Sequence, residues 1–223
     1  MLTAQPSPTA GDSRGGRALA LHLVRASDLE AEGPSAPETV PWSLEGLAGR
    51  LVELSGPTGA PFLSLACALI RQAQEQGEYA VWVSAREDSF YPPDAAAAGV
   101  ALPALPVVRL AGSASAGQAA DWLLRTGAFA LVVLDLGRDL ALGLGLQGRL
   151  AQLARRQNTA VLILTEKNRG APSLSSLVAV RAEALRRRDP EGDFRCGVSF
   201  LKHKRRAPGG RCMEVFVGPP GLR

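Results

Sequence analysis

The fifteen residues from Arg50 to Ser64, RLVELSGPTGAPFLS, constrain the fold of this chain more than any other stretch. A short apolar run ends at Gly56, a turn sequence passes through Gly59, and an apolar helical pattern follows directly. A strand, a glycine-containing loop and a helix in this order make up a phosphate-binding loop, whose working version reads G-x-x-x-x-G-K-[ST]. There, backbone N–H groups surround the phosphates, the lysine reaches the outer phosphates and the hydroxyl holds Mg²⁺. The stretch therefore predicts the frame of a nucleotide-binding fold.

The chemical groups of such a loop are missing from this frame. Counting from Gly56, Pro61 stands where the second glycine belongs, Phe62 replaces the lysine and Leu63 replaces the hydroxyl residue. Proline has no N–H to donate, and phenylalanine brings no charge to a phosphate. Two interpretations stay open: an ordinary turn between a strand and a helix, or a nucleotide-binding fold that has lost its nucleotide. A shifted loop with Ser64 as the hydroxyl residue is the arrangement that would rescue weak binding.

Strand-like and helical patterns alternate through the middle of the chain. Strands are expected at residues 50–55, 79–85, 106–110, 130–136 and 159–165, and helices at residues 62–76, 94–98, 116–126 and 144–157. The last two strands are continuous apolar runs, which is typical of parallel strands covered on both faces. Alternation of this kind predicts a parallel sheet with right-handed crossovers.

The pattern changes after residue 170. Three consecutive strands are expected at residues 177–185, 194–203 and 211–217, joined by turn sequences at 189–192 and 207–210. The predicted fold class is α/β, with a mostly parallel twisted sheet flanked by helices and extended by antiparallel C-terminal strands. For the domain organisation we expect a disordered tail at 1–16, an N-terminal helix and lead-in segment at 17–49, and a core at 50–223. The C-terminal hairpin region of this core is expected from about residue 176.

Composition excludes several classes of protein. The chain has 223 residues, of which 46% are apolar, and this is enough for a buried core. No window approaches the roughly 18–20 continuous apolar residues of a membrane span, and the N-terminus lacks the apolar core of a secretory signal. The cysteines Cys67, Cys196 and Cys212 have no metal-like spacing and lie in apolar patterns, which predicts buried thiols in a reducing compartment. We expect a cytoplasmic protein without a metal or cofactor.

Basic residues are concentrated near the C-terminus. The net charge is +4 with a pI near 9.3, and residues 181–211 contain ten Lys/Arg against four Asp/Glu. Such a segment suits nucleic acid or an acidic partner, while the alternative is a solvated strand surface. The candidate binding residues are Arg186, Arg187, Arg188, Lys202, Lys204, Arg205 and Arg206.

Five stretches in order resemble the core of RecA-type recombinases, over roughly residues 42–220. They are LEGLAGRLVELSGPTG, AVWVSAREDSFYPPDAAAAGV, FALVVLDL, TAVLILTEKNRG and VSFLKHKRRAPGGRCMEVFVGPPG. The resemblance places Asp135 at the magnesium-associated aspartate, Arg86 at the water-activating glutamate and Glu166 at the nucleotide-sensing glutamine. It also matches Lys202 and Lys204 to a K-x-K pair that reaches nucleotide across a subunit boundary in RecA filaments.

The departures from this family pattern argue against catalysis. Phosphoryl transfer depends on positioning and charge neutralisation, and the lysine, the glutamate and the glutamine are replaced by Phe62, Arg86 and Glu166. We therefore expect neither ATP hydrolysis nor tight ATP binding. The segments that correspond to the DNA-binding loops of RecA, 137–145 and 167–174, are short and carry few basic or aromatic groups.

Within the RecA-like proteins, a core of this size without ATPase residues resembles ImuA, an accessory subunit of bacterial SOS-induced translesion mutagenesis. That resemblance implies a non-catalytic role through protein contacts, with an ImuB-like polymerase-family protein as partner and RecA itself as a second candidate. The same architecture is similar to SulA-type cell-division inhibitors. A direct DNA-binding module is the other alternative, so weak or indirect DNA binding stays open.

Overall fold

The computed structural model describes residues 42–86, 90–188, 194–204 and 211–214. All of them belong to one compact unit, residues 37–223. The predicted tail at 1–16, the helix from residue 17 and the turns at 189–192 and 207–210 lie outside the described residues.

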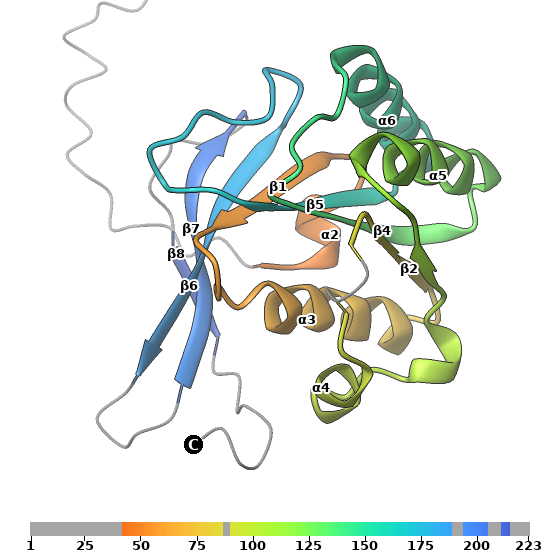
Figure 1. Ribbon diagram of the computed structural model, residues 1–223. Helices are drawn as coiled ribbons and strands as arrows, with labels where there is room; N and C mark the ends of the chain where they lie inside the picture. Colours follow the sequence, from red (N-terminus) through yellow and green to blue (C-terminus); the bar gives the residue numbers. More distant parts are fainter. Residues whose placement is uncertain (1–41, 87–89, 189–193, 205–210, 215–223) are drawn as a thin grey trace, which may run out of the picture. The chain divides into compact units, whose positions relative to one another are not determined.

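An eight-stranded sheet forms the centre of this unit (Figure 1), with the strand order β3-β2-β4-β5-β1-β6-β7-β8. All pairs among β1 to β6 are parallel, and β7 and β8 continue the sheet in antiparallel pairing. The strands are β1 (Leu51–Gly56), β2 (Tyr79–Ser84), β3 (Val107–Arg109), β4 (Phe129–Gly137), β5 (Ala160–Glu166), β6 (Val180–Arg188), β7 (Phe194–His203) and β8 (Arg211–Glu214). The predicted fold class is confirmed.

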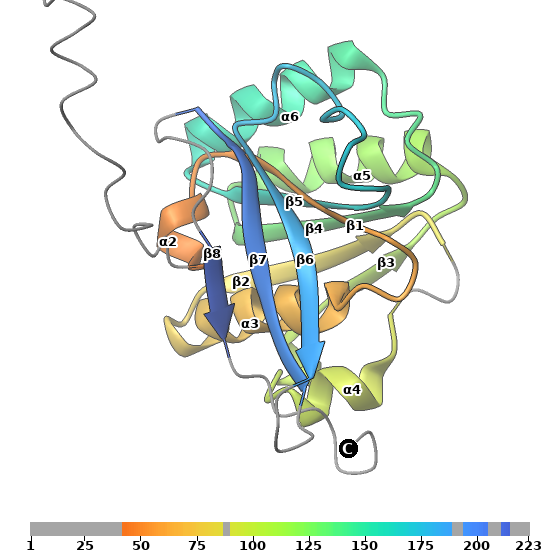
Figure 2. The ribbon, with the colours of Figure 1, turned by 90° about the vertical axis from the view of Figure 1, so that its left-hand side faces the viewer.

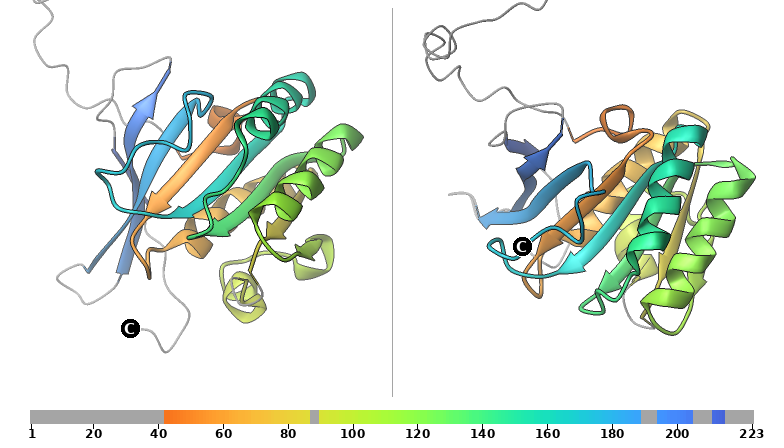
Figure 3. Two further views of the ribbon diagram at one scale, coloured as in Figure 1. Left: turned by 45° about the horizontal axis from the view of Figure 1, so that its top comes forward. Right: turned by 90° about the horizontal axis from the view of Figure 1, so that it is seen from above.

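Helices cover both faces of the sheet (Figure 2), with α3 and α4 on one face and α5 and α6 on the other. Figure 3 shows α5 and α6 side by side over the parallel strands. The helices are α2 (Leu44–Leu47), α3 (Phe62–Glu75), α4 (Pro92–Ala97), the 3₁₀ helix η1 (Leu102–Ala104), α5 (Ser113–Thr126) and α6 (Leu144–Gln157).

The central strands are apolar on both sides because each side faces a helix layer. In β5, Leu162 and Leu164 pack into the cluster around α3, whereas Val161 and Ile163 pack into the cluster around α5 and α6. Successive strand side chains point to opposite faces, so a continuous apolar run supplies two cores at once. Trp42, just before α2, joins the α3 cluster and donates its indole N–H to the Leu65 carbonyl at 3.0 Å.

Helix α5 begins three residues earlier than the sequence pattern indicates. Its first residue is Ser113 rather than Ala116, and the Ser113 N–H donates to Asp139 Oδ2 at 2.9 Å. A side chain from the segment after β4 thus satisfies an N–H at the start of this helix. The C-terminus follows the prediction, because Gly127 ends the helix in a left-handed conformation with φ of 67°.

The two described thiols are buried, as predicted, and this makes their reactivity testable. Burial, together with the nearby Asp94, raises the pKa of Cys67 to about 12. Burial also raises the pKa of Cys196, although Arg186 and a hydrogen bond from Ser64 oppose the rise. Because the thiolate is the reactive form, a Cys212→Ser variant should not react with a thiol-specific reagent at pH 8 until urea unfolds it. Rapid labelling of the native variant would contradict this prediction.

Candidate functional site

The loop between β1 and α3 has the backbone of a tight turn. Gly59 has φ of 80°, and a Cβ at Gly56 would lie 2.7 Å from the Ala60 Cβ, so both positions require glycine. The Ala60 N–H donates to the Pro57 carbonyl at 3.0 Å, and the Phe62 N–H donates to the Ala60 carbonyl at 2.8 Å. With these two donors used inside the loop, and with proline at the helix N-cap, the loop offers few N–H groups to an anion.

A cavity of about 370 Å³ lies beside this loop, at the carboxyl ends of the parallel strands. Its apolar lining comes from Phe62, Leu63, Trp82 and Leu164. Phe62 is partly buried and packs against the core cluster around α3. The position that carries the lysine in a working phosphate loop is therefore occupied by an apolar side chain that packs against the core.

The cavity also brings together polar residues that are far apart in the sequence. Arg86, Asp135 and Glu166 line it together with Gly59, as their shared place at the carboxyl ends of parallel strands suggests. Ser64 does not join them. Its hydroxyl instead hydrogen bonds with the Cys196 thiol on β7.

Glu166 is the centre of a cluster that we call the Glu166 clasp, made of Thr58, Arg86, Arg138 and Glu166. Arg86 Nη1 lies 2.5 Å from Glu166 Oε1 and Arg138 Nε lies 3.1 Å from Glu166 Oε2. The Thr58 hydroxyl donates to Glu166 Oε2 at 3.1 Å and accepts from Arg138 Nη2 at 2.5 Å. Thr58 and Arg138 were not among the residues predicted from the sequence.

The clasp favours the ionised form of Glu166. Burial by itself raises the pKa of this carboxyl, but hydrogen bonds from Arg138, Arg86 and Thr58 outweigh it and bring the pKa below the ordinary value of 4.5. A carboxyl group whose ionised form accepts several hydrogen bonds loses its proton more readily than a free carboxyl group.

This lowered pKa predicts a pH-dependent contribution to stability. Since the folded-state pKa lies below 4.5, the contribution is present above that pH and is lost as the pH falls through the folded-state pKa. At pH 7 we expect Glu166→Gln to lower the free energy of unfolding by about 1 kcal/mol, because both arginines are solvent-exposed. The difference from the wild type, measured by urea unfolding, should shrink below pH 4.5. A difference that stays constant down to pH 3 would contradict it.

Asp135 lies between Leu134 and Leu136 near the end of β4 and is 7% exposed. Its Oδ1 accepts a hydrogen bond of 3.2 Å from the Gly137 N–H, at a register shift between β4 and β5. Within the described residues, no group of three or more His, Cys, Asp or Glu side chains is arranged to hold a metal ion. None of the helices described here has the length and apolar character needed to cross a membrane.

A second, buried network fixes the segment that follows β5. Glu53 on β1 is fully buried and forms an ion pair with Lys167, whose side chain is 8% exposed. Glu53 also accepts from the Thr165 hydroxyl and the Leu174 N–H, each at 3.0 Å. Both ends of the segment 167–174 are therefore held by one buried carboxylate.

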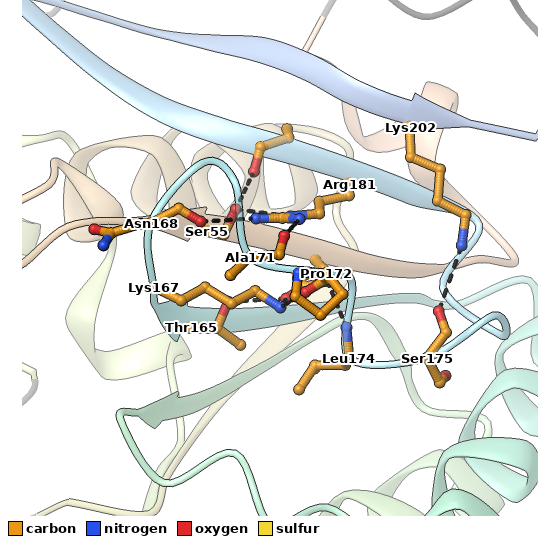
Figure 4. A network of polar contacts seen from close by, with 12 residues as sticks. Ser55, Thr165, Lys167, Asn168, Ala171, Pro172, Leu174, Ser175, Arg181 and Lys202 are labelled. Carbon is orange, nitrogen blue, oxygen red and sulfur yellow. Dashed lines mark hydrogen bonds and ion pairs between the residues drawn. The ribbon is translucent and has the colours of Figure 1, made fainter.

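Arg181 on β6 holds the middle of the same segment (Figure 4). Its guanidinium donates to the carbonyls of Asn168, Arg169 and Ala171, and its Nε donates to the Ser55 hydroxyl at 3.1 Å. Because Arg181 is nearly buried, its guanidinium needs several acceptors, and the carbonyls of this segment supply them.

The basic candidate residues fall into two groups. Arg186, Arg187 and Arg188 end β6, whereas Lys202 and Lys204 lie at the other end of the β6–β7 pair. The two groups are about six residues apart along the strands, as the pairs Arg181↔Lys202 and Arg187↔Arg195 show. At the usual rise per strand residue, this corresponds to about 20 Å. Arg205 and Arg206 lie outside the described residues, so the single basic patch suggested by the sequence is divided in the fold.

The two groups have different surroundings. Arg186 and Arg188 lie over the Phe194 ring, with guanidinium carbons 5.1 and 5.9 Å from its centroid. Lys202 Nζ donates to the Ser175 carbonyl at 3.4 Å. Burial is the main cause that lowers the pKa of Lys202; the charge of nearby Lys204 lowers it further, and the charge of Glu53 opposes both. All three arginines are exposed, whereas in the lysine group Lys202 is half-buried and Lys204 is exposed.

These observations define an α/β protein with a RecA-like sheet and a loop-and-cavity site at the carboxyl edge of its parallel strands. Among curated proteins, Protein RecA from Corynebacterium urealyticum is 34% identical over 128 residues, which make up 52% of this chain and 34% of that protein. The match thus spans about a third of the length of the curated relative. No family model matches the sequence. Fold and similarity together support a RecA-like protein.

Proposed function

We propose that this protein is a non-catalytic RecA-like accessory protein in bacterial DNA-damage tolerance, within SOS-induced translesion mutagenesis. The observation that carries the proposal is the apolar contact of Phe62 at the lysine position of the loop. A phosphoryl-transfer site works by placing positive charge against the phosphates. Here the nearby cations, Arg86 and Arg138, are already paired with Glu166.

Protein contacts are the function that such a fold retains without a nucleotide. The partners that we propose are an ImuB-like polymerase-family protein and, as a second partner, RecA itself. Among the described residues, Trp122 on α5 is a large apolar side chain with 74% of its surface exposed. Tryptophan is enriched at the centres of protein interfaces, so Trp122 is our first candidate for a contact residue.

The test is a set of parallel binding titrations with the purified full-length chain. We expect an ImuB-like protein or RecA to be retained without added ATP, and labelled ATP to show no saturable binding. Retention should weaken in a Trp122→Ala variant and persist in Tyr79→Ala, which removes another exposed aromatic side chain. Failure with both partners would overturn the accessory role. Saturable ATP binding with a Kd in the micromolar range, about −8 kcal/mol, would overturn the prediction that Phe62 excludes the nucleotide.

One observation favours direct DNA binding as a second candidate function. Arg186, Arg187 and Arg188 are exposed together at the end of β6, with Arg195 opposite Arg187 on β7. Each arginine that contacts phosphate adds about one unit to the slope of log affinity against log salt.

We therefore expect alanine at Arg186, Arg187 and Arg188 to weaken DNA binding and to reduce that slope by about 2–3. Alanine at Arg149, Arg155 and Arg156 on α6, which are also exposed, serves as the charge-matched control in the same salt titration. Equal effects of the two sets would exclude a specific arginine site.

A further inference from the structure

Four separate segments meet at Glu166. Thr58 comes from the loop after β1, Arg86 follows β2, Arg138 follows β4, and Glu166 itself is the last residue of β5. Each of the other three makes a direct contact with the Glu166 carboxylate. In nucleotide-dependent proteins, the segments beside the site are ordered by their contacts with a phosphate group. Here a side chain of the protein makes the corresponding contacts.

The clasp has the composition of an oxyanion site. Two guanidinium groups and a hydroxyl converge on a carboxylate whose side chain is 13% exposed, so two positive charges surround one negative charge. Guanidinium groups bind carboxylates and phosphates with the same planar donor geometry. Thr58 completes the arrangement, since it donates to Glu166 and accepts from Arg138.

The surrounding backbone leaves room for this arrangement. Gly137 has φ of 56°, and a Cβ there would lie 2.6 Å from Arg86 Cδ. Glycine at 137 therefore permits the path of the Arg86 side chain toward Glu166. Cavities of about 370 and 330 Å³ lie against the clasp, and both are lined by Thr58, Arg86 and Glu166. If the Glu166 side chain were removed, the volume that it occupies would become part of these cavities.

We propose that Thr58, Arg86 and Arg138 form an oxyanion-binding site that the chain fills with its own Glu166 carboxylate. Glu166 thereby holds the four segments together without any bound ligand. The ligand class is a carboxylate or tetrahedral oxyanion, and inorganic phosphate is the external probe that fits the site once Glu166 is shortened. This inference rests on the proposal that the site binds no nucleotide. It does not depend on which partner protein the chain binds.

Hydrogen exchange with phosphate rescue tests the proposal. In full-length Glu166→Ala, amides of residues 58–60 and 137–139 should exchange faster than in the wild type, on the order of threefold to tenfold. Millimolar phosphate should slow them again, whereas sodium chloride at the same ionic strength should not. In the wild type, phosphate should have no effect, because Glu166 already fills the site.

Two variants identify the site of the response. Glu166→Ala combined with Arg138→Ala should lose the rescue by phosphate. Glu183→Ala removes a different glutamate–arginine pair, with Arg169, and should leave the exchange of residues 58–60 unchanged. The proposal is overturned if Glu166→Ala exchanges like the wild type, if phosphate fails to slow its exchange, or if phosphate slows the wild type equally. Pull-down failure would overturn the partner assignment and leave these exchange results standing.

Discussion

Replacement of Glu53 by alanine is expected to lower the free energy of unfolding by about 3–5 kcal/mol. Glu53 is fully buried and pairs with the nearly buried ammonium group of Lys167. Without the carboxylate, this ammonium group stays in the interior with the Pro172 carbonyl as its remaining described partner. The Leu174 N–H and the Thr165 hydroxyl also lose their acceptor. Urea unfolding, compared at equal m-values, measures the loss.

Two further variants separate the buried charge from other effects. Glu75→Ala removes an exposed carboxylate that pairs with Arg71 at 2.8 Å, and it should cost less than about 0.5 kcal/mol. In the double variant Glu53→Leu with Lys167→Met, both buried charges are replaced by apolar groups, so much of the stability should return. A loss in Glu53→Ala no larger than in Glu75→Ala would show that Lys167 finds water when its partner is removed.

The elements with strong local patterns could be predicted closely. Helix α6 was expected at 144–157 and is observed there, and β7 was expected at 194–203 and is observed there. In α6 the apolar positions recur from Leu144 to Ala154, and β7 lies between two clear turn sequences. The start of α5 could not be predicted in this way, since the Asp139 carboxylate that receives the Ser113 N–H lies 26 residues away in the sequence.

The candidate site was predictable in outline because of the sheet topology. Arg86, Asp135 and Glu166 each follow an apolar strand, and the carboxyl ends of parallel strands share one edge. The partners of Glu166 were not predictable. Arg86 lies 80 residues from Glu166 in the sequence, and Arg138 has no pattern that marks it as a clasp residue. Pairings of this kind depend on side-chain direction in the folded sheet.

The polar network beneath the site was also missed, for a related reason. Glu53 interrupts the apolar run of β1, and a buried charged residue is rare unless it is paired. That interruption was the available signal. Its partner Lys167 lies in the segment after β5, where a lysine resembles any exposed loop residue. Only the parallel pairing of β1 with β5 brings the two together.

Reconstruction of the phosphate loop is expected to strengthen ATP binding relative to the wild type. The variant combines Pro61→Gly, Phe62→Lys and Leu63→Ser with Glu166→Gln, so that the loop reads G-x-x-x-x-G-K-S from Gly56. Glycine restores an N–H donor, lysine supplies charge to the outer phosphates, and the glutamine removes a carboxylate from the cavity. A charge-assisted hydrogen bond contributes about 1.5–3 kcal/mol, so the lysine alone should strengthen binding about tenfold to a hundredfold.

The matched control carries Phe62→Met with the other three substitutions, which keeps a long side chain and omits the charge. Labelled Mg-ATP titrations should give measurable affinity for the lysine variant and at least about tenfold weaker binding for the methionine variant. Circular dichroism of both variants controls for the loss of the Phe62 packing contact. If the two bind ATP equally, or if neither binds while both stay folded, then Phe62 is not the residue that excludes the nucleotide. In that case the turn between β1 and α3, with its internally bonded Ala60 and Phe62 N–H groups, has a backbone that cannot surround a phosphate.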